Sequence, residues 1–195
     1  MYAHQTPSQT PNQTVMLIGI SGKKRSGKDT VGAMVVEWLR KHYCSATRVA
    51  FADQLKEEVA RATGVSLEDI EVEKAHWRPM LQWWGVEFRR YYHGENYWIR
   101  EMTKKLIGME EAVAVITDVR LENEAEFVRK SGGLVVRVER EIDAQDSHSS
   151  EFGLDGYQHF REVIRNDGSL EDLQQKVGDF MAGLKLQDEW GLAVS

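Results

Sequence analysis

The stretch LIGISGKKRSGKDT, residues 17–30, decides the fold. Residues 15–20 form an apolar run, which predicts a buried strand. From Thr30 to Tyr43 the apolar side chains recur at spacings of three and four, which predicts a helix. A basic, glycine-bounded loop between a strand and a helix is the context of a phosphate-binding loop.

The residue types in this loop suit the binding of phosphate. Gly22 and Gly27 allow backbone shapes that bring N–H groups close to an anion. The helix that starts near Lys28 adds its positive dipole end, and Lys28 supplies a cation for a transferring phosphoryl group. The sequence therefore predicts a phosphate site made by Gly22, Arg25, Ser26, Gly27, Lys28, Asp29 and Thr30.

Asp29 departs from the common motif, in which a Ser or Thr after the lysine binds magnesium. A carboxylate beside a triphosphate is repelled unless a cation lies between them. Two interpretations stay open. Asp29 binds Mg²⁺, directly or through water, or it points away as a helix N-terminal anion.

Length and composition narrow the class of protein. The 195 residues predict one domain, 15–186, between a disordered N-terminal tail, 1–14, and a C-terminal tail, 187–195. The first tail lacks the features of a signal peptide, and no apolar run is long enough to span a membrane. A formal net charge of −6 argues against nucleic acid as the main partner. The single cysteine, Cys44, fits a reducing cytoplasm.

The rest of the chain continues the alternation of strands and helices. Further strands are predicted at 48–51, 113–117, 134–138 and 162–164. Helices are predicted over 53–63 with Asp53 as cap, from Ser66, over 97–107 with Asn96 as cap, over 122–130, and from Ser169. Residues 140–158 are polar and carry acids without a metal-ligand spacing, which favours a mobile lid.

Residues 77–92 are rich in aromatic and basic side chains, and Pro79 suits the first turn of a helix there. One stripe, at spacings of four, three and four, holds Arg78, Gln82, Gly85 and Arg89. This face could line a pocket for an anionic, planar ligand, with Arg78 at a phosphate, Gln82 at a base edge and Gly85 leaving room. The alternative is a solvated charged face. The glycine, which costs about 1 kcal/mol in mid-helix, favours close approach of another group.

Asp118 and Arg120 follow a buried strand, at the edge where parallel α/β sheets bind ligands. Asp118 could hold magnesium through water, and Arg120 could bind a phosphate bidentately. The alternative is a surface ion pair at a turn.

Taken together, these segments resemble the bacteriophage deoxynucleoside monophosphate kinases, within the P-loop nucleoside monophosphate kinase group. The matching segments are 22–30, 51–56, 78–87, 97–98, 118–120, 146–151 and 164–168. The stretch from Arg78 to Arg89, combined with Asp118-Val119-Arg120, is more specific than the phosphate loop, and the family shares Asp29.

The resemblance implies an α/β P-loop kinase fold: about five parallel strands with helices on both faces, an acceptor-binding insertion at about 53–107 and a lid at about 141–160. It implies Mg²⁺-assisted transfer of the γ-phosphate of ATP to a deoxynucleoside monophosphate, in the host cytoplasm if the protein is phage-encoded, and it suggests a homodimer. Magnesium would lie at Asp29 and Asp118, the adenine near Asn166. The acceptor would contact Lys56, Arg78, Gln82, Trp84, Gly85 and Arg120.

The lid raises the question of which arginine stabilises the transferring charge, because residues 141–160 contain none. Arg140, at the lid entrance, is the candidate beside Lys28 and Arg120 as catalytic residues; the alternatives are Arg137, Arg161 and Arg165. Two rival functions stay open. One is another small-molecule kinase of this fold, such as dephospho-coenzyme A kinase, and the other is a nucleotide-binding regulator or ATPase without an acceptor.

Overall fold

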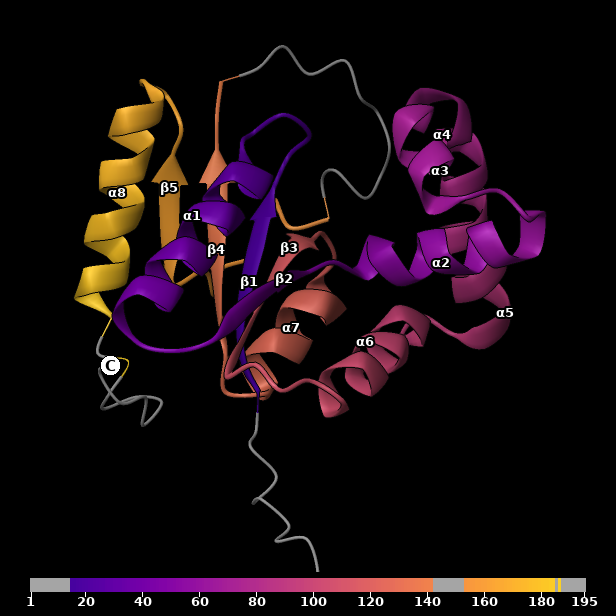
Figure 1. Ribbon diagram of the computed structural model, residues 1–195, viewed down its shortest axis with the longest axis horizontal. Helices are drawn as coiled ribbons and strands as arrows, with labels where there is room; N and C mark the ends of the chain where they lie inside the picture. Colours follow the sequence, from indigo (N-terminus) through magenta and orange to yellow (C-terminus); the bar gives the residue numbers. More distant parts are fainter. Residues whose placement is uncertain (1–14, 142–152, 185, 187–195) are drawn as a thin grey trace, which may run out of the picture.

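A five-stranded parallel sheet forms the centre of the computed structural model, which describes residues 15–141, 153–184 and 186 (Figure 1). The strand order is β2-β3-β1-β4-β5, and all four neighbouring pairs are parallel. The strands are β1 Met16–Gly22, β2 Ala46–Val49, β3 Val113–Val119, β4 Leu134–Glu139 and β5 Glu162–Arg165. The predicted sheet is confirmed. Both predicted tails and the centre of the predicted lid lie outside the described residues.

Helices cover both faces of the sheet, as predicted. The side chains of Ile18 and Ile20 on β1 pack with α1 (Lys28–His42) and α8 (Leu170–Gly183). Leu17, on the opposite face, packs with α6 (Tyr97–Ile107) and α7 (Glu122–Lys130). Successive residues of a strand point to opposite faces, so one apolar run supplies both cores. No helix in the described residues is long and apolar enough to cross a bilayer.

Between β2 and β3 a helical segment extends to one side of the sheet (Figure 1). It comprises α2 Phe51–Thr63, α3 Leu67–Val72, α4 Lys74–Gln82, the π-helix η1 Trp83–Arg90, α5 Tyr91–His93 and α6. Two predictions are corrected here. Asp53 is not the cap of α2: Ala50 is, and its N–H donates to Asp53 Oδ2 at 2.9 Å. Pro79 lies inside α4 instead of in its first turn.

The π-helix also changes the predicted stripe. Arg78 and Gln82 lie on α4, whereas Gly85 and Arg89 lie on η1, where hydrogen bonds run from residue i to residue i+5. A π-helix turns less per residue than an α-helix, so the α-helical spacing on which the stripe was predicted ends at Gln82.

Candidate active site

The loop between β1 and α1 is shaped to hold an anion. Arg25 and Gly27 have left-handed φ angles of 65° and 96°, and the N–H of Ser26 donates to Lys23 O at 3.1 Å. Where left-handed and right-handed backbone conformations alternate, successive N–H groups point into one concave site that can bind an anion. Lys28 opens α1, where the first N–H groups have no intrahelical partner, and its Nζ lies 3.5 Å from Lys23 O. Loop amides, helix end and lysine thus meet at one point.

Asn166, from the turn after β5, braces this loop. Its Nδ2 donates to Ser26 O at 2.9 Å, and its N–H donates to Glu139 O at 2.7 Å. A Cβ at Gly27 would lie 2.4 Å from Asn166 Nδ2, so both the φ angle and the contact require glycine. The family resemblance implied a place for Asn166 near the adenine; the structure shows its side chain against the phosphate loop.

A cavity of about 390 Å³ lies between the phosphate loop and the ends of β4 and β5. This volume falls in the range of about 300–1,000 Å³ that is usual for small-ligand sites. Its lining includes Lys23, Ser26, Arg137, Arg140, Arg165 and Asp167. The cavity therefore offers cationic side chains next to the predicted phosphate site.

Two of the arginines at this cavity differ in their surroundings. Arg137 donates from Nη1 to Leu154 O at 2.9 Å and from Nη2 to Asp155 Oδ1 at 2.6 Å. Arg140, in contrast, is exposed. Asp155 also pairs with Lys23 Nζ at 3.2 Å. Burial opposes the charge of Asp155, but Arg137 and Lys23 outweigh it and lower the pKa of this carboxyl. Arg137 is thus engaged by the segment after residue 152, whereas the role of Arg140 stays a prediction.

The two predicted magnesium residues lie in different settings. Asp118, at the end of β3, accepts the N–H of Phe51 at 2.8 Å and that of Ala52 at 2.9 Å, so it anchors the start of α2. Burial, with a contribution from Glu124, raises the pKa of Asp118 to about 6, although both amides and Arg120 favour the charged form. Asp29 lies in the first turn of α1 with its side chain 70% exposed, and it faces Arg48 at 3.7 Å.

Neither carboxylate belongs to a preformed metal cluster. Within the described residues, no group of three or more His, Cys, Asp or Glu side chains could hold an ion. Mg²⁺ at kinase sites is held by one or two carboxylates together with phosphate oxygens and waters. A single exposed carboxylate beside a phosphate loop, such as Asp29, fits that donor set.

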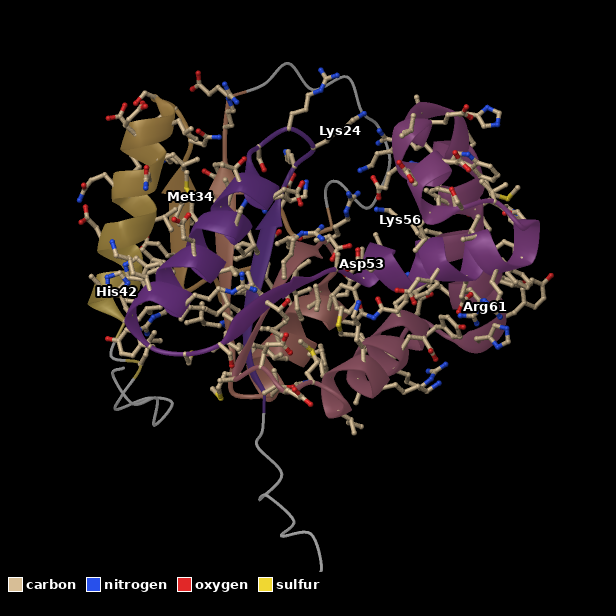
Figure 2. The ribbon with its side chains drawn as sticks, in the orientation of Figure 1. Lys24, Met34, His42, Asp53, Lys56 and Arg61 are labelled. Carbon is tan, nitrogen blue, oxygen red and sulfur yellow. The ribbon has the colours of Figure 1, made fainter. Side chains whose placement is uncertain are left out.

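The predicted acceptor residues are only partly brought together. Figure 2 shows Lys56 on α2 and Lys24 on the phosphate loop, and Lys56 Nζ pairs with the carboxylate of Glu71. Gly85 is buried: a Cβ there would lie 3.2 Å from Leu55 Cδ2, and Trp98 Nε1 donates to Gly85 O at 3.0 Å. The predicted room for a sugar or base beside Gly85 is wrong, because side chains of α2 and α6 fill it.

Glu58, which sequence reasoning missed, organises the aromatic part of this segment. Its carboxylate accepts Trp84 Nε1 at 3.0 Å, Arg89 Nε at 2.7 Å and the hydroxyl of Tyr97. The Arg89 guanidinium lies 5.1 Å from the centre of the Tyr97 ring. Arg89 and Trp84 of η1 and Tyr97 of α6 therefore share Glu58 of α2 as a partner, which joins the three helices. A lone acid on an amphipathic helix gives no sequence signal for such a role.

A parallel sheet with a phosphate loop at the carboxyl end of its central strand defines a P-loop nucleotide-binding enzyme. The family model for deoxynucleotide monophosphate kinase matches residues 73–177, more than half of the chain. The chain belongs to the deoxynucleotide monophosphate kinase family.

Similar proteins extend this match to most of the chain. A protein of Acanthamoeba polyphaga mimivirus, provisionally named a deoxynucleotide monophosphate kinase, is 28% identical over 84% of this chain and 94% of its own. The deoxynucleoside-5'-monophosphate kinase of Escherichia phage T5 is 23% identical over 85% of this chain and 95% of its own. Among solved structures, shikimate kinase from Acinetobacter baumannii aligns with a TM-score of 0.48 at 18% identity, over 89% of this chain and 97% of that one.

Proposed function

We propose that this chain transfers the γ-phosphoryl group of ATP to a deoxynucleoside monophosphate, giving ADP and the deoxynucleoside diphosphate. The observation that carries the proposal is the phosphate loop with buried Lys28 at a helix N-terminus, in a chain whose residues 73–177 match the kinase family. That match disfavours both dephospho-coenzyme A phosphorylation and acceptor-free ATP hydrolysis.

On the donor side, the loop amides and Lys28 hold the β- and γ-phosphates, with Thr30 at the α-phosphate. Lys28 needs no large movement, because it already lies across the loop from Lys23 O. Asp29 is the carboxylate that would hold Mg²⁺, with Asp118 acting through water. When bound, the ion would neutralise charge on the phosphate oxygens. Arg140, at the cavity rim, supports the transferring charge.

On the acceptor side, Arg78 and Arg120 bind the monophosphate and Gln82 faces the base edge, with Lys56 and Trp84 nearby. Arg78 and Gln82 are half-buried on α4, and Arg120 is half-buried after β3, so each retains partial access to solvent. Guanidinium groups suit this task because they bind phosphate oxygens bidentately. The helices that carry Lys56, Arg78 and Gln82 all lie between β2 and β3, in the stretch from α2 to α6 that we call the acceptor segment.

An ADP-release assay over dTMP, dGMP, dCMP, dAMP, dephospho-coenzyme A and no acceptor tests the function. We expect release that depends on at least one of the four deoxynucleotides. Lys28→Met should lower kcat by about 10²–10³ without loss of folding, because Lys28 stabilises charge in the transition state. Lys41→Met, at the other end of α1, is the matched control. Equal release without an acceptor, or only with dephospho-coenzyme A, would overturn the proposal.

Two further points concern the cellular compartment and the oligomeric state. The reducing compartment that the single Cys44 fits, together with phage and viral relatives, supports action in the host cytoplasm. A homodimer is proposed from the family resemblance alone. Sedimentation of the purified chain at micromolar concentration checks it, and a monomeric mass would refute it.

A further inference from the structure

We propose that Glu124 is a positioning residue that sets the Arg120 turn against the acceptor segment, and so controls the affinity for the monophosphate. This inference rests on the proposed function, because it assumes that Arg120 binds the acceptor. Glu124 lies in the first turn of α7 and is 3% exposed. A buried carboxylate is costly unless every oxygen has partners, so its contacts need an explanation.

One oxygen of Glu124 holds the turn that carries Arg120. Oε2 accepts the N–H of Arg120 at 2.8 Å and that of Leu121 at 3.1 Å. The contact to Leu121 is the ordinary capping-box interaction of a helix start. The contact to Arg120 goes beyond capping, because it fixes the backbone of the residue whose side chain is assigned to the phosphate.

The other oxygen of Glu124 holds the acceptor segment. Oε1 lies 2.7 Å from Arg90 Nη2, and the Arg90 side chain is only 10% exposed. Arg90 is the last residue of η1. Beside it, Asn123 Nδ2 donates to Glu95 O at 3.2 Å and to Asn96 Oδ1 at 2.9 Å, which ties the same turn to the start of α6. One carboxylate thus links the acceptor helices to the Arg120 turn.

Helix capping alone would not require the second link. In a capping box the glutamate needs only the backbone N–H at the helix start as its partner. Here a charged pair is enclosed between the end of η1 and the first turn of α7, 34 residues apart in the chain. The helix α4, which carries Arg78, leads directly into η1, and Arg120 lies just before the start of α7. Small displacements of binding groups cost catalysis heavily, so a rigid link at this place has a functional consequence.

Two substitutions separate the link from the cap. In Glu124→Gln one amide oxygen can still accept the backbone N–H groups, but its NH₂ faces the Arg90 guanidinium and breaks the pair. Arg90→Met removes the cation, keeps most of the apolar stem and leaves the cap intact. Glu122→Gln, an exposed acid in the same helical turn, is the matched control.

The test measures steady-state kinetics of the full chain with ATP and the acceptor that wild type prefers, after circular dichroism has shown folding. We expect Glu124→Gln and Arg90→Met each to raise KM for the monophosphate by about tenfold or more, with KM for ATP changed less than about twofold. The double variant should be no worse than the worse single one, because both break one link. The control should match wild type.

Unchanged acceptor KM in the folded variants, or an equal rise in KM for ATP, overturns the inference. If Glu124→Gln does not fold, Arg90→Met alone decides, since it leaves the cap in place. If wild type itself shows no dependence on a deoxynucleotide, the proposed function fails instead, so the two failures are distinguishable.

Discussion

Replacing Glu58 by alanine should detach the aromatic half of the acceptor segment from α2. Glu58 accepts three hydrogen bonds, from Trp84, Arg89 and Tyr97, and its side chain is 16% exposed. Hydrogen bonds to a charged group contribute about 1.5–3 kcal/mol each, and water compensates part of the loss at partly buried sites. We therefore expect Glu58→Ala to lower the free energy of unfolding by about 3–4 kcal/mol.

Urea unfolding, followed by tryptophan fluorescence, measures this loss, with Glu57→Ala on the exposed side of α2 as the matched control. Burial acts to raise the pKa of Glu58, but the bonds from Tyr97, Trp84 and Arg89 outweigh it, and the pKa lies below its usual 4.5. The stability that Glu58 contributes is thus present above pH 4.5 and lost as pH falls through the lowered pKa. The difference between wild type and variant should shrink in acid.

A loss below about 1 kcal/mol at neutral pH, close to that of Glu57→Ala, would refute this account of the segment. So would a difference that does not change between pH 7 and pH 3, because the partners would then not depend on the charge of Glu58.

Three further predictions concern the site. Arg78→Ala should lower kcat/KM for the monophosphate at least about tenfold while ATP binding, measured by calorimetry, stays the same; equal weakening of ATP would contradict it. Asp29→Asn should raise the Mg²⁺ concentration for half-maximal rate, and a drop in thermal stability alone would favour the helix-end interpretation. The pKa of Asp118 is about 6 in the folded chain and 3.8 in the unfolded chain. The contribution of Asp118 to the free energy of unfolding is therefore largest below pH 3.8 and falls by about 3 kcal/mol as the pH rises through 6. Unfolding of wild type against Asp118→Asn from pH 4 to 7 measures this, and a constant difference would exclude it.

The sheet and the loop between β1 and α1 were predictable because their signals are local. An apolar run, a glycine-bounded basic loop and helical spacing all occur within residues 15–43. The predicted bounds of α6 and α7 agree with the structure, and Ser169 caps α8 by accepting the N–H of Asp172 at 3.1 Å. Each of these features depends on residues a few positions apart.

The acceptor segment was harder to predict because its contacts join distant residues. Spacing alone assigned Gly85 to a ligand, but the group that approaches it is Leu55, thirty positions earlier. The prediction from spacing also assumed an α-helix, whereas residues 83–90 form a π-helix. This form is rare, and the periodicity of apolar residues does not reveal it. Nothing nearby in the sequence shows that Asp118, predicted as a magnesium residue, also anchors the start of α2.

The end of β3 explains how donor and acceptor sites keep their relative position. Asp118 holds the start of α2, and Glu124 holds the end of η1, so the acceptor segment is attached twice to a stretch of seven residues. On β1, Ser21 pairs with Val119 of the same stretch and leads directly into the phosphate loop. Phosphoryl transfer needs the two substrates in line, and its catalysis is largely positioning. We therefore expect the pairing of β1 with β3 to set the relative position of the two substrates in this chain.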